Sequence, residues 1–427
     1  MLEPKKLKNG MRVHLVPVLG TTATTVMVLV DVGSRREPDE VWGGAHFLEH
    51  LCFKGTKKYP KTKDISSLLD RYGAQYNAFT GKDLTAYYVK IEGGKTKIAI
   101  DLLYEMLFQS LHRPKDLEQE RKVILEEFKM YEENPLMHVD DLLERALYRG
   151  TRLGKDIIGS KKSLASMTRA DLLKFRAAHY EPSQMVVVVA GAIPETIMKT
   201  LEGSFGKVAT GKNETKKEEL TLETYGTSSE PRIERQYKKL EQIQVGIAYP
   251  TFGRDHKDSA ALGMLSYILG GSMSSRLFLE VRERHGLCYF VRAEADGFKD
   301  IGSFTIRAGL DAARLPEALK VIFAEVEKIK SKGVSAEELA FAKDHIAGAT
   351  KLAFEDSFAQ AEFVGRQEIM LGDVKTIEEK LKKIRAVTKE DVKRVAKLIL
   401  TPERMSLAVV GPYKTDAALR EALPVIK

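Results

Sequence analysis

Along the first half of the chain, runs of β-branched and apolar residues alternate with amphipathic segments. Residues 11–18 and 24–33 are rich in valine, which favours strands, and residues 74–92 predict two strands around a Gly-Lys-Asp turn. Apolar positions three and four apart predict further helical segments at 45–53, 61–73, 96–109 and 116–134. Strands followed by groups of helices, without strict β–α–β alternation, predict the α+β class, with an antiparallel sheet covered by helices.

Residues 167–191 align without a gap with residues 387–411, so the same pattern of helix and strand recurs at an offset of 220 residues. Each copy has a threonine suited to cap a helix, an amphipathic segment, a proline-marked turn and an apolar strand ending at glycine. We therefore predict two homologous tandem domains, and two unrelated helix–turn–strand units are the alternative. The polar, charged stretch 213–231 predicts a linker, which places the domains at 1–212 and 232–427.

The composition is that of a globular chain, with 43% hydrophobic and 30% charged residues among 427. The net charge of +8 comes from scattered lysines without a basic, aromatic-rich stripe, so we expect a solvated surface and no nucleic-acid binding. No apolar run is long enough to cross a bilayer, and no secretory signal is evident, so we expect no membrane association and a cytoplasmic location. The two cysteines, Cys52 and Cys288, make no disulfide framework and fit a reducing compartment.

Two histidines and a glutamate, His46, Glu49 and His50, lie within five positions of an otherwise apolar stretch. On a helix, His46 and His50 share a face, so that two imidazole nitrogens can converge on one ion. Glu49 lies at the edge of that face, where it can reach a water beside the ion. The order H-x-x-E-H is the reverse of the H-E-x-x-H zinc motif. A hydrogen-bonded pair of core histidines is the alternative.

A catalytic zinc site needs a third protein ligand and an open position, and the predicted helix 116–134 offers glutamates for it. Glu120 and Glu127 lie two helical turns apart on one face. Val123 and Ile124 lie between them, so we expect that face to be partly buried. The spacing favours Glu127 as the ligand and Glu120 as the hydrogen-bond partner of a ligand histidine. The spacing alone does not exclude Glu126.

Four stretches of the chain together resemble the M16-type inverzincin peptidases of the pitrilysin and mitochondrial processing peptidase type, in their short two-domain form. These stretches are residues 32–56, 76–88, 120–135 and 270–289. The resemblance implies a zinc metalloendopeptidase with one Zn²⁺ per chain, held by His46, His50 and Glu127. It further implies that Glu49 is the general base and that Glu120 assists nearby.

The resemblance also implies that an arginine and a tyrosine, Arg282 and Tyr289, complete the active site from the half of the chamber without metal. Arg282 would hold the substrate, and Tyr289 would donate a hydrogen bond to the oxyanion. The residues alone predict a surface ion pair for Arg282 and a core position for Tyr289. Because the family chamber is a clamshell of four such domains, this chain would form half of it, and a homodimer partner would supply both residues. A heterodimer with a metal-free partner is the alternative assembly.

The resemblance implies an edge strand beside the zinc, to which an extended peptide pairs. This strand would contain Asn77, Ala78 and Phe79. On sequence alone these are equally well ordinary strand residues.

We expect hydrolysis of peptides or unfolded polypeptide segments, with Glu49 taking the proton of the attacking water. The alternative function is a non-catalytic or regulatory subunit of a heterodimeric processing peptidase. Such subunits lack part of the pentad that this chain keeps.

Overall fold

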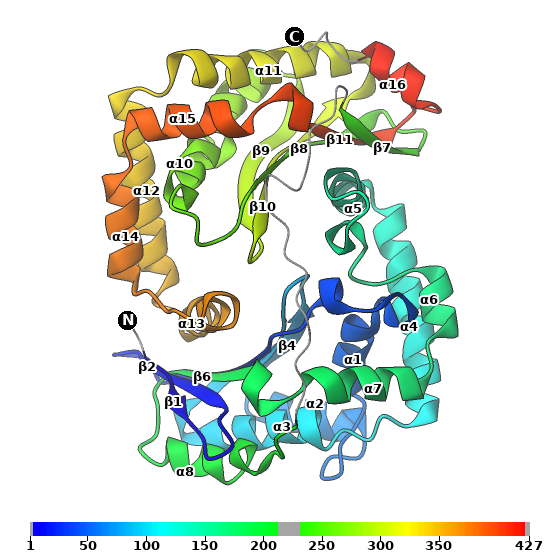
Figure 1. Cartoon of the computed structure of the whole chain (residues 1–427), viewed down its shortest axis with the longest axis vertical. Helices are drawn as coiled ribbons and strands as arrows, with labels where there is room; N and C mark the ends of the chain where they lie inside the picture. The colour runs from blue at the N-terminus through cyan, green and yellow to red at the C-terminus, as the bar shows by residue number, and fades with distance from the viewer. Residues whose placement is uncertain (1–2, 212–230, 423–427) are drawn as a thin grey trace. The chain divides into compact units, whose positions relative to one another are not determined.

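The computed structural model describes residues 3–211 and 231–422, which contain two β-sheets (Figure 1). Each sheet lies in its own compact unit. Of the described residues, unit 1 comprises 3–128, 155–211 and 349–376, and unit 2 comprises 129–154, 231–348 and 377–422. The predicted α+β class with two helix-covered sheets is confirmed. Of the predicted linker 213–231, all but Pro231 lies outside the described residues.

The sheet of unit 1 has the strand order β1-β2-β6-β3-β5-β4. Its strands are β1 (Lys5–Lys6), β2 (Arg12–Pro17), β3 (Ala23–Val30), β4 (Gln75–Thr80), β5 (Thr85–Glu92) and β6 (Met185–Gly191). The central register places Val26 of β3 opposite Val89 of β5 and Val189 of β6. The β2–β6 pair is parallel, unlike its neighbours, and the long stretch of chain between β2 and β6 provides the crossover connection that parallel pairing requires.

The sheet of unit 2 has the order β7-β11-β8-β10-β9, which matches β2-β6-β3-β5-β4 strand for strand. Its strands are β7 (Arg232–Tyr237), β8 (Gln242–Phe252), β9 (Cys288–Gly297), β10 (Ile301–Asp311) and β11 (Ser406–Gly411). The equivalent pair, β7–β11, is again the parallel one. Each sheet is therefore antiparallel except for one pair, which the sequence analysis did not predict.

The helices flank the two sheets. They are α1 (Gly44–Cys52), α2 (Thr62–Arg71), α3 (Thr96–Phe108), α4 (Pro114–Glu133), α5 (Pro135–Leu147), α6 (Lys161–Ser166), α7 (Arg169–His179), α8 (Ile197–Glu202), α10 (Ser259–Gly270), α11 (Leu315–Lys332), α12 (Ala336–Ala353), α13 (Ser357–Leu371), α14 (Ile377–Ala386), α15 (Lys389–Ile399) and α16 (Asp416–Ala422). Within the described ranges, none has both the length and the apolar character needed to span a bilayer.

The sequence repeat corresponds to α7 followed by β6 and to α15 followed by β11. The threonine side chains of Thr168 and Thr388 accept hydrogen bonds from the backbone N–H groups of Asp171 and Asp391, respectively. Each aspartate in turn accepts a hydrogen bond from the threonine N–H, which completes a capping box. The predicted helix starts are therefore present in both copies.

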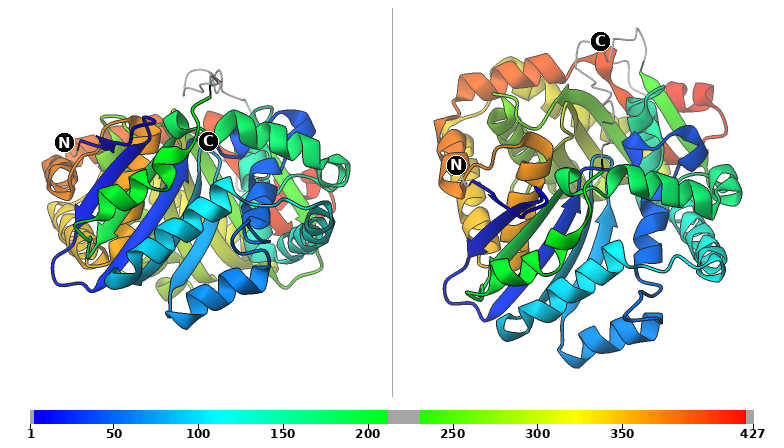
Figure 2. Two further views of the ribbon diagram at one scale, coloured as in Figure 1. Left: turned by 90° about the horizontal axis from the view of Figure 1, so that it is seen from below. Right: turned by 60° about the horizontal axis from the view of Figure 1, so that its bottom comes forward.

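Each sheet is covered on one face by a helix from the other half of the sequence. In unit 1, α13 lies on the face formed by Met27, Leu29 and neighbouring residues, and α3 lies on the opposite face (Figures 1 and 2). Gly365 of α13 permits this approach, because a Cβ atom there would lie 2.3 Å from a methyl group of Leu29. In unit 2, α5 covers β8 and β11 in the same manner. Strands covered on both faces require unbroken apolar runs, as in β6, where every residue is buried.

An ion-pair cluster fastens α13 to the sheet of unit 1. The carboxylate of Glu368, which is buried, lies 2.7 Å from Arg12 Nη1 and 2.8 Å from His14 Nε2 on β2. Hydrogen bonding to His14 lowers the pKa of Glu368, and the Arg12 charge lowers it further. The paired carboxylate can therefore remain ionised although it is buried.

Candidate metal centre

Helix α1 carries the H-x-x-E-H motif, and its apolar residues decide which side chains face outward. Leu48 and Cys52, four positions apart, are buried in the core of unit 1. His46, Glu49 and His50 are consequently turned away from the core, and all three are half-buried. The helix thus places the three ionisable side chains of the motif together at the edge of the core.

Helix α4 presents Glu120, Ile124 and Glu127 on one face. Glu120 and Ile124 are buried and Glu127 is half-buried, whereas Glu126 is exposed. Val123, which we expected on the partly buried face, is 45% exposed, so that expectation is wrong for this residue. The face follows positions 120, 124 and 127, and Val123 is rotated by about 100° from Ile124.

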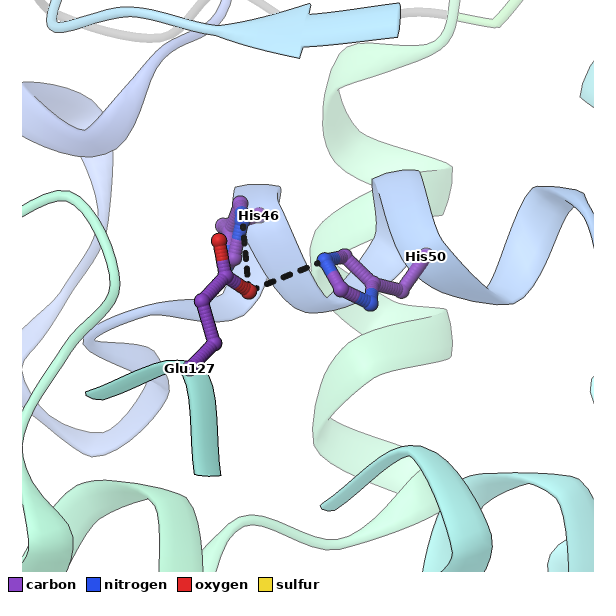
Figure 3. Close-up of side chains that lie close together, drawn as sticks. All are labelled: His46, His50 and Glu127. Atoms are coloured by element: carbon purple, nitrogen blue, oxygen red, sulfur yellow. Dashed lines mark ion pairs between the residues drawn. The ribbon is translucent and has the colours of Figure 1, made fainter. Parts of the chain in front are cut away.

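His46, His50 and Glu127 point toward one another (Figure 3). One oxygen of Glu127 lies 3.4 Å from His50 Nε2 and 3.7 Å from His46 Nε2, and the three ligand atoms of the cluster lie within 4.8 Å of one another. These distances exceed those of ordinary N–H···O hydrogen bonds. Ligands at about 2.1 Å from a tetrahedral zinc ion lie about 3.4 Å apart, so the three residues fit a shared zinc ion. Two imidazoles and one carboxylate also match the donor set of catalytic zinc sites.

The environment keeps His46 in the neutral form that binds metal. Burial, and to a smaller extent the neighbouring His50, lower the pKa of His46 to about 4, although the charge of Glu127 opposes this effect. A neutral imidazole leaves a ring nitrogen available as a ligand.

His50 has the opposite shift. Burial alone would lower its pKa, but the hydrogen bond to Glu120, the carboxylate of Glu127 and the charge of Glu49 raise it to about 9. Three carboxylates thus favour positive charge at this position. Without metal that charge is a proton on His50, and a bound cation would replace it.

Glu120 fixes the orientation of the His50 ring. Its Oε2 lies 3.2 Å from His50 Nδ1, and its Oε1 lies 2.6 Å from Lys54 Nζ. Burial raises the pKa of Glu120, but the hydrogen bonds with His50 and Lys54 outweigh burial and lower it overall. An ionised Glu120 accepts from Nδ1–H and leaves Nε2 directed toward Glu127. The sequence analysis did not identify Lys54. Lys54 follows His50 by four residues, and this spacing is the feature of the sequence that could have pointed to it.

Glu49 lies beside the cluster and is held by the end of strand β4. The hydroxyl of Thr80 donates a hydrogen bond to Glu49 Oε2 at 2.5 Å. Burial raises the pKa of Glu49, and the Thr80 hydrogen bond partly opposes this shift. A carboxylate with a raised pKa is a better proton acceptor, as a general base requires. The sequence analysis did not identify Thr80.

Strand β4 is an edge of its sheet, because within the described residues it pairs with β5 alone. Along it, Asn77 is exposed, Ala78 is buried and Phe79 is half-buried. The guanidinium of Arg366 on α13 lies 5.0 Å from the Phe79 ring. The edge leads directly to Thr80 and therefore to Glu49, so a peptide added to β4 would pass beside the cluster.

Arg282 and Tyr289 lie together in unit 2. The Arg282 guanidinium lies 5.4 Å from the Tyr289 ring and 4.8 Å from the Phe278 ring. Tyr289 is 74% exposed, so the core position that the residues alone predicted is wrong. Arg282 has a nearby carboxylate, 3.7 Å away on Glu283, which is the surface ion pair considered for it. Their positions within unit 2 do not decide whether both residues contribute to an active site, so this contribution stays a prediction.

The two helix-covered sheets and the His–His–Glu cluster define a two-domain protein of the metallopeptidase type. Family models agree: the one described as Insulinase (Peptidase family M16) matches residues 15–161, and the one described as Peptidase M16 inactive domain matches residues 166–346. Together with the full-length relatives below, they show that the chain belongs to peptidase family M16. The resemblance stated from the four motifs is confirmed.

The relatives cover almost the whole chain. An uncharacterized zinc protease of Streptomyces coelicolor is 33% identical over 97% of this chain and 90% of its own. The uncharacterized zinc protease YmxG of Bacillus subtilis is 33% identical over 96% of this chain and 98% of its own. A protease from Helicobacter pylori superposes with a TM-score of 0.90 at 24% identity, covering 96% of this chain and 99% of its own. This last match supports the fold alone.

Proposed function

We propose that the chain is a zinc-dependent endopeptidase that hydrolyses peptides or unfolded polypeptide segments in a chamber formed by a dimer. The observation that carries the proposal is the convergence of His46, His50 and Glu127, with Glu49 beside them. The names of the relatives, which are zinc proteases, support the same metal and reaction. The alternative of a non-catalytic subunit has less support, because every residue of the pentad is present.

When bound, one zinc ion per chain would supply Lewis-acid chemistry, which makes water acidic near neutral pH and polarises the scissile carbonyl. His46, His50 and Glu127 would hold the ion. Glu49, with its raised pKa, would accept the proton of the attacking water and deliver it to the leaving amine. The backbone of β4 at Asn77, Ala78 and Phe79 would align an extended substrate by strand addition.

What one chain contains supports the proposal of a dimer. Within the described residues, each chain has one candidate metal-binding cluster in unit 1 and the Arg282–Tyr289 pair in unit 2. If each metal cluster is completed by the pair of the partner chain, a homodimer has two equivalent sites and needs no second gene product. Tyr289 would donate a hydrogen bond to the oxyanion, and Arg282 would hold the substrate.

A single substitution at Glu49 tests the reaction. The Glu49→Gln variant should retain zinc, measured by elemental analysis, and should lose hydrolysis of a quenched fluorescent peptide by at least about 100-fold, as for removal of a general base. The matched control is Glu118→Gln, an exposed glutamate on α4, which should keep both. Full activity in Glu49→Gln would exclude Glu49 as the base. An inactive wild-type chain that forms a stable dimer would favour the non-catalytic alternative.

A second pair of variants tests the ligand that the spacing left open. Glu127→Gln should reduce the zinc content, whereas Glu126→Gln should bind zinc like the wild type, because only Glu127 faces the two rings. The reverse result would make Glu126 the ligand and would require another arrangement of α4.

A further inference from the structure

A buried carboxylate outside the H-x-x-E-H motif holds the start of the helix that carries it. Glu37 is only 3% exposed, and both of its oxygens accept hydrogen bonds from the first turn of α1. Oε2 accepts from Gly43 N–H at 2.6 Å, and Oε1 accepts from Ala45 N–H at 2.7 Å. The residue following Ala45 is His46, so the hydrogen bonds of Glu37 end directly before the first histidine.

This arrangement offsets only part of the cost of burying Glu37. Burial is the largest influence on the pKa of Glu37, and the net value is raised to about 8 although hydrogen bonds from Ala45 and Gly43 and the charges of Lys82 and Lys155 oppose the rise. The positive end of the α1 dipole favours a carboxylate at the same place. Both carboxyl oxygens of Glu37 thus serve as acceptors for N–H donors at the start of α1.

The backbone on the other side leaves α1 little room to shift. Gly43 has φ of 92°, and a Cβ atom there would lie 2.6 Å from the carbonyl oxygen of Ile158 and 2.9 Å from Cα of Gly159. The first turn of α1 is thus enclosed between Glu37 and the 158–159 backbone. A change in the position of Glu37 would therefore change the position of the whole short helix relative to α4 and β4.

The segment that contains Glu37 is also tied to the turn after the edge strand β4. Ser34 N–H donates to Gly81 O at 3.0 Å, and Arg35 N–H donates to Lys82 O at 3.1 Å. The Arg35 guanidinium pairs with Asp83 at 3.0 Å. Residues 33–37 therefore join the β4–β5 turn to the start of α1.

We propose that Glu37 is a positioning residue that fixes α1 against α4 and so sets the affinity of the His46, His50 and Glu127 cluster for zinc. The inference rests on the proposed zinc site. Glu37 acts through Gly43 and Ala45 and touches neither metal nor substrate.

The variant Glu37→Gln tests this role with little change of shape. The amide keeps one acceptor and presents an NH₂ group to the second N–H donor, so one of the two hydrogen bonds is lost. We expect the zinc dissociation constant, measured by competition with a chromophoric chelator, to rise by at least about tenfold, as for residues that orient metal ligands. The control is Thr388→Ala, which removes a side-chain hydrogen bond from the start of α15 in unit 2. It should leave the zinc affinity unchanged.

Hydrogen exchange of the wild-type chain gives a second test that does not depend on the variant folding. If the start of α1 sets zinc affinity, zinc binding must in turn stabilise it. Zinc should therefore slow exchange in a peptide containing Gly43 and Ala45 and leave a peptide containing residues 388–391 unchanged. An unchanged dissociation constant in folded Glu37→Gln, or unchanged exchange at the start of α1, would overturn the inference alone. A wild-type chain that binds no zinc would overturn the proposed function and this inference with it.

Discussion

Glu120 accepts a hydrogen bond from His50 Nδ1 at 3.2 Å, and this contact determines which nitrogen of the ring faces Glu127. Lys54 pairs with the other oxygen of Glu120 at 2.6 Å and keeps the buried carboxylate ionised. The cluster is therefore supported by a series of polar contacts, in which Lys54 pairs with Glu120 and Glu120 orients the candidate ligand His50.

Removing the charge of Glu120 should weaken zinc binding. In Glu120→Gln the amide oxygen can still accept from His50, but the charge that makes the ring basic is lost. We expect the zinc dissociation constant to rise by about 10- to 100-fold, measured by chelator competition. Glu118→Gln on the same helix is the control, because Glu118 is exposed and pairs with Arg121 instead. Equal affinities in both variants would show that Glu120 has no part in the metal site.

Zinc affinity should depend strongly on pH. The pKa of His50 in the metal-free chain is raised to about 9, so at neutral pH zinc must displace a proton from the ring. The dissociation constant should rise about tenfold for each pH unit lowered below 9, from this group alone. Calorimetry in buffers of different ionisation enthalpy should detect about one proton released per zinc near pH 7. Binding independent of pH, without proton release, would contradict the raised pKa.

Mixing two inactive variants should restore activity if the partner chain completes each site. Glu49→Gln lacks the base but keeps Arg282, and Arg282→Ala keeps Glu49. After subunit exchange, half of the dimers carry one intact site of two, so about one quarter of the wild-type activity should return. Mixing Glu49→Gln with a Glu127→Gln chain is the control, because both changes lie in unit 1. Failure of the first mixture under proven exchange would exclude completion by the partner.

The ion pairs of α13 should contribute to the stability of unit 1. Removing Glu368 leaves buried His14 and half-buried Arg12 without their carboxylate, which should lower the free energy of unfolding by about 3 kcal/mol. Glu362→Ala on the same helix breaks only a partly exposed pair with Arg366 and should cost less than about 1 kcal/mol. Urea unfolding compares the two, and similar midpoints would contradict a special role for Glu368.

The stabilisation by Glu368 also has an expected pH dependence. Its pKa is lowered in the folded chain, so its contribution is complete above the ordinary glutamate pKa and is lost as the pH falls through the lowered value. The difference in unfolding free energy between wild type and Glu368→Ala should therefore shrink under acidic conditions and remain constant near neutral pH.

The local elements were predictable because their patterns depend on near neighbours. The helix of His46 and His50, the strands β4 and β5 and the threonine caps at Thr168 and Thr388 all agree with the sequence patterns. Spacing favoured Glu127 over Glu126 but did not exclude Glu126. The helical period places the two residues on different faces of the helix, but it does not indicate which face meets α1. The structure places Glu127 beside the rings.

The long-range relationships were not predictable from one sequence. Glu37 acts on a helix that begins seven residues later, through hydrogen bonds that leave no periodic signal. Tyr289 has a large aromatic side chain, of the kind that is expected in a core, but it lies exposed beside Arg282. The placement of α5 and α13 on the sheet of the other half also had no local signal. The unbroken apolar run of β6 only indicates that both faces are covered, without naming the covering helix.

The reciprocal placement of α5 and α13 means that neither half of the gene product contains everything needed to shield its own sheet from water. A piece ending at residue 211 would carry α5 without the strands it covers, and a piece starting at residue 231 would carry α13 without β3 and β6. Two such pieces made together should remain associated on gel filtration after the covalent connection is gone, whereas either made by itself should aggregate through its bare apolar face.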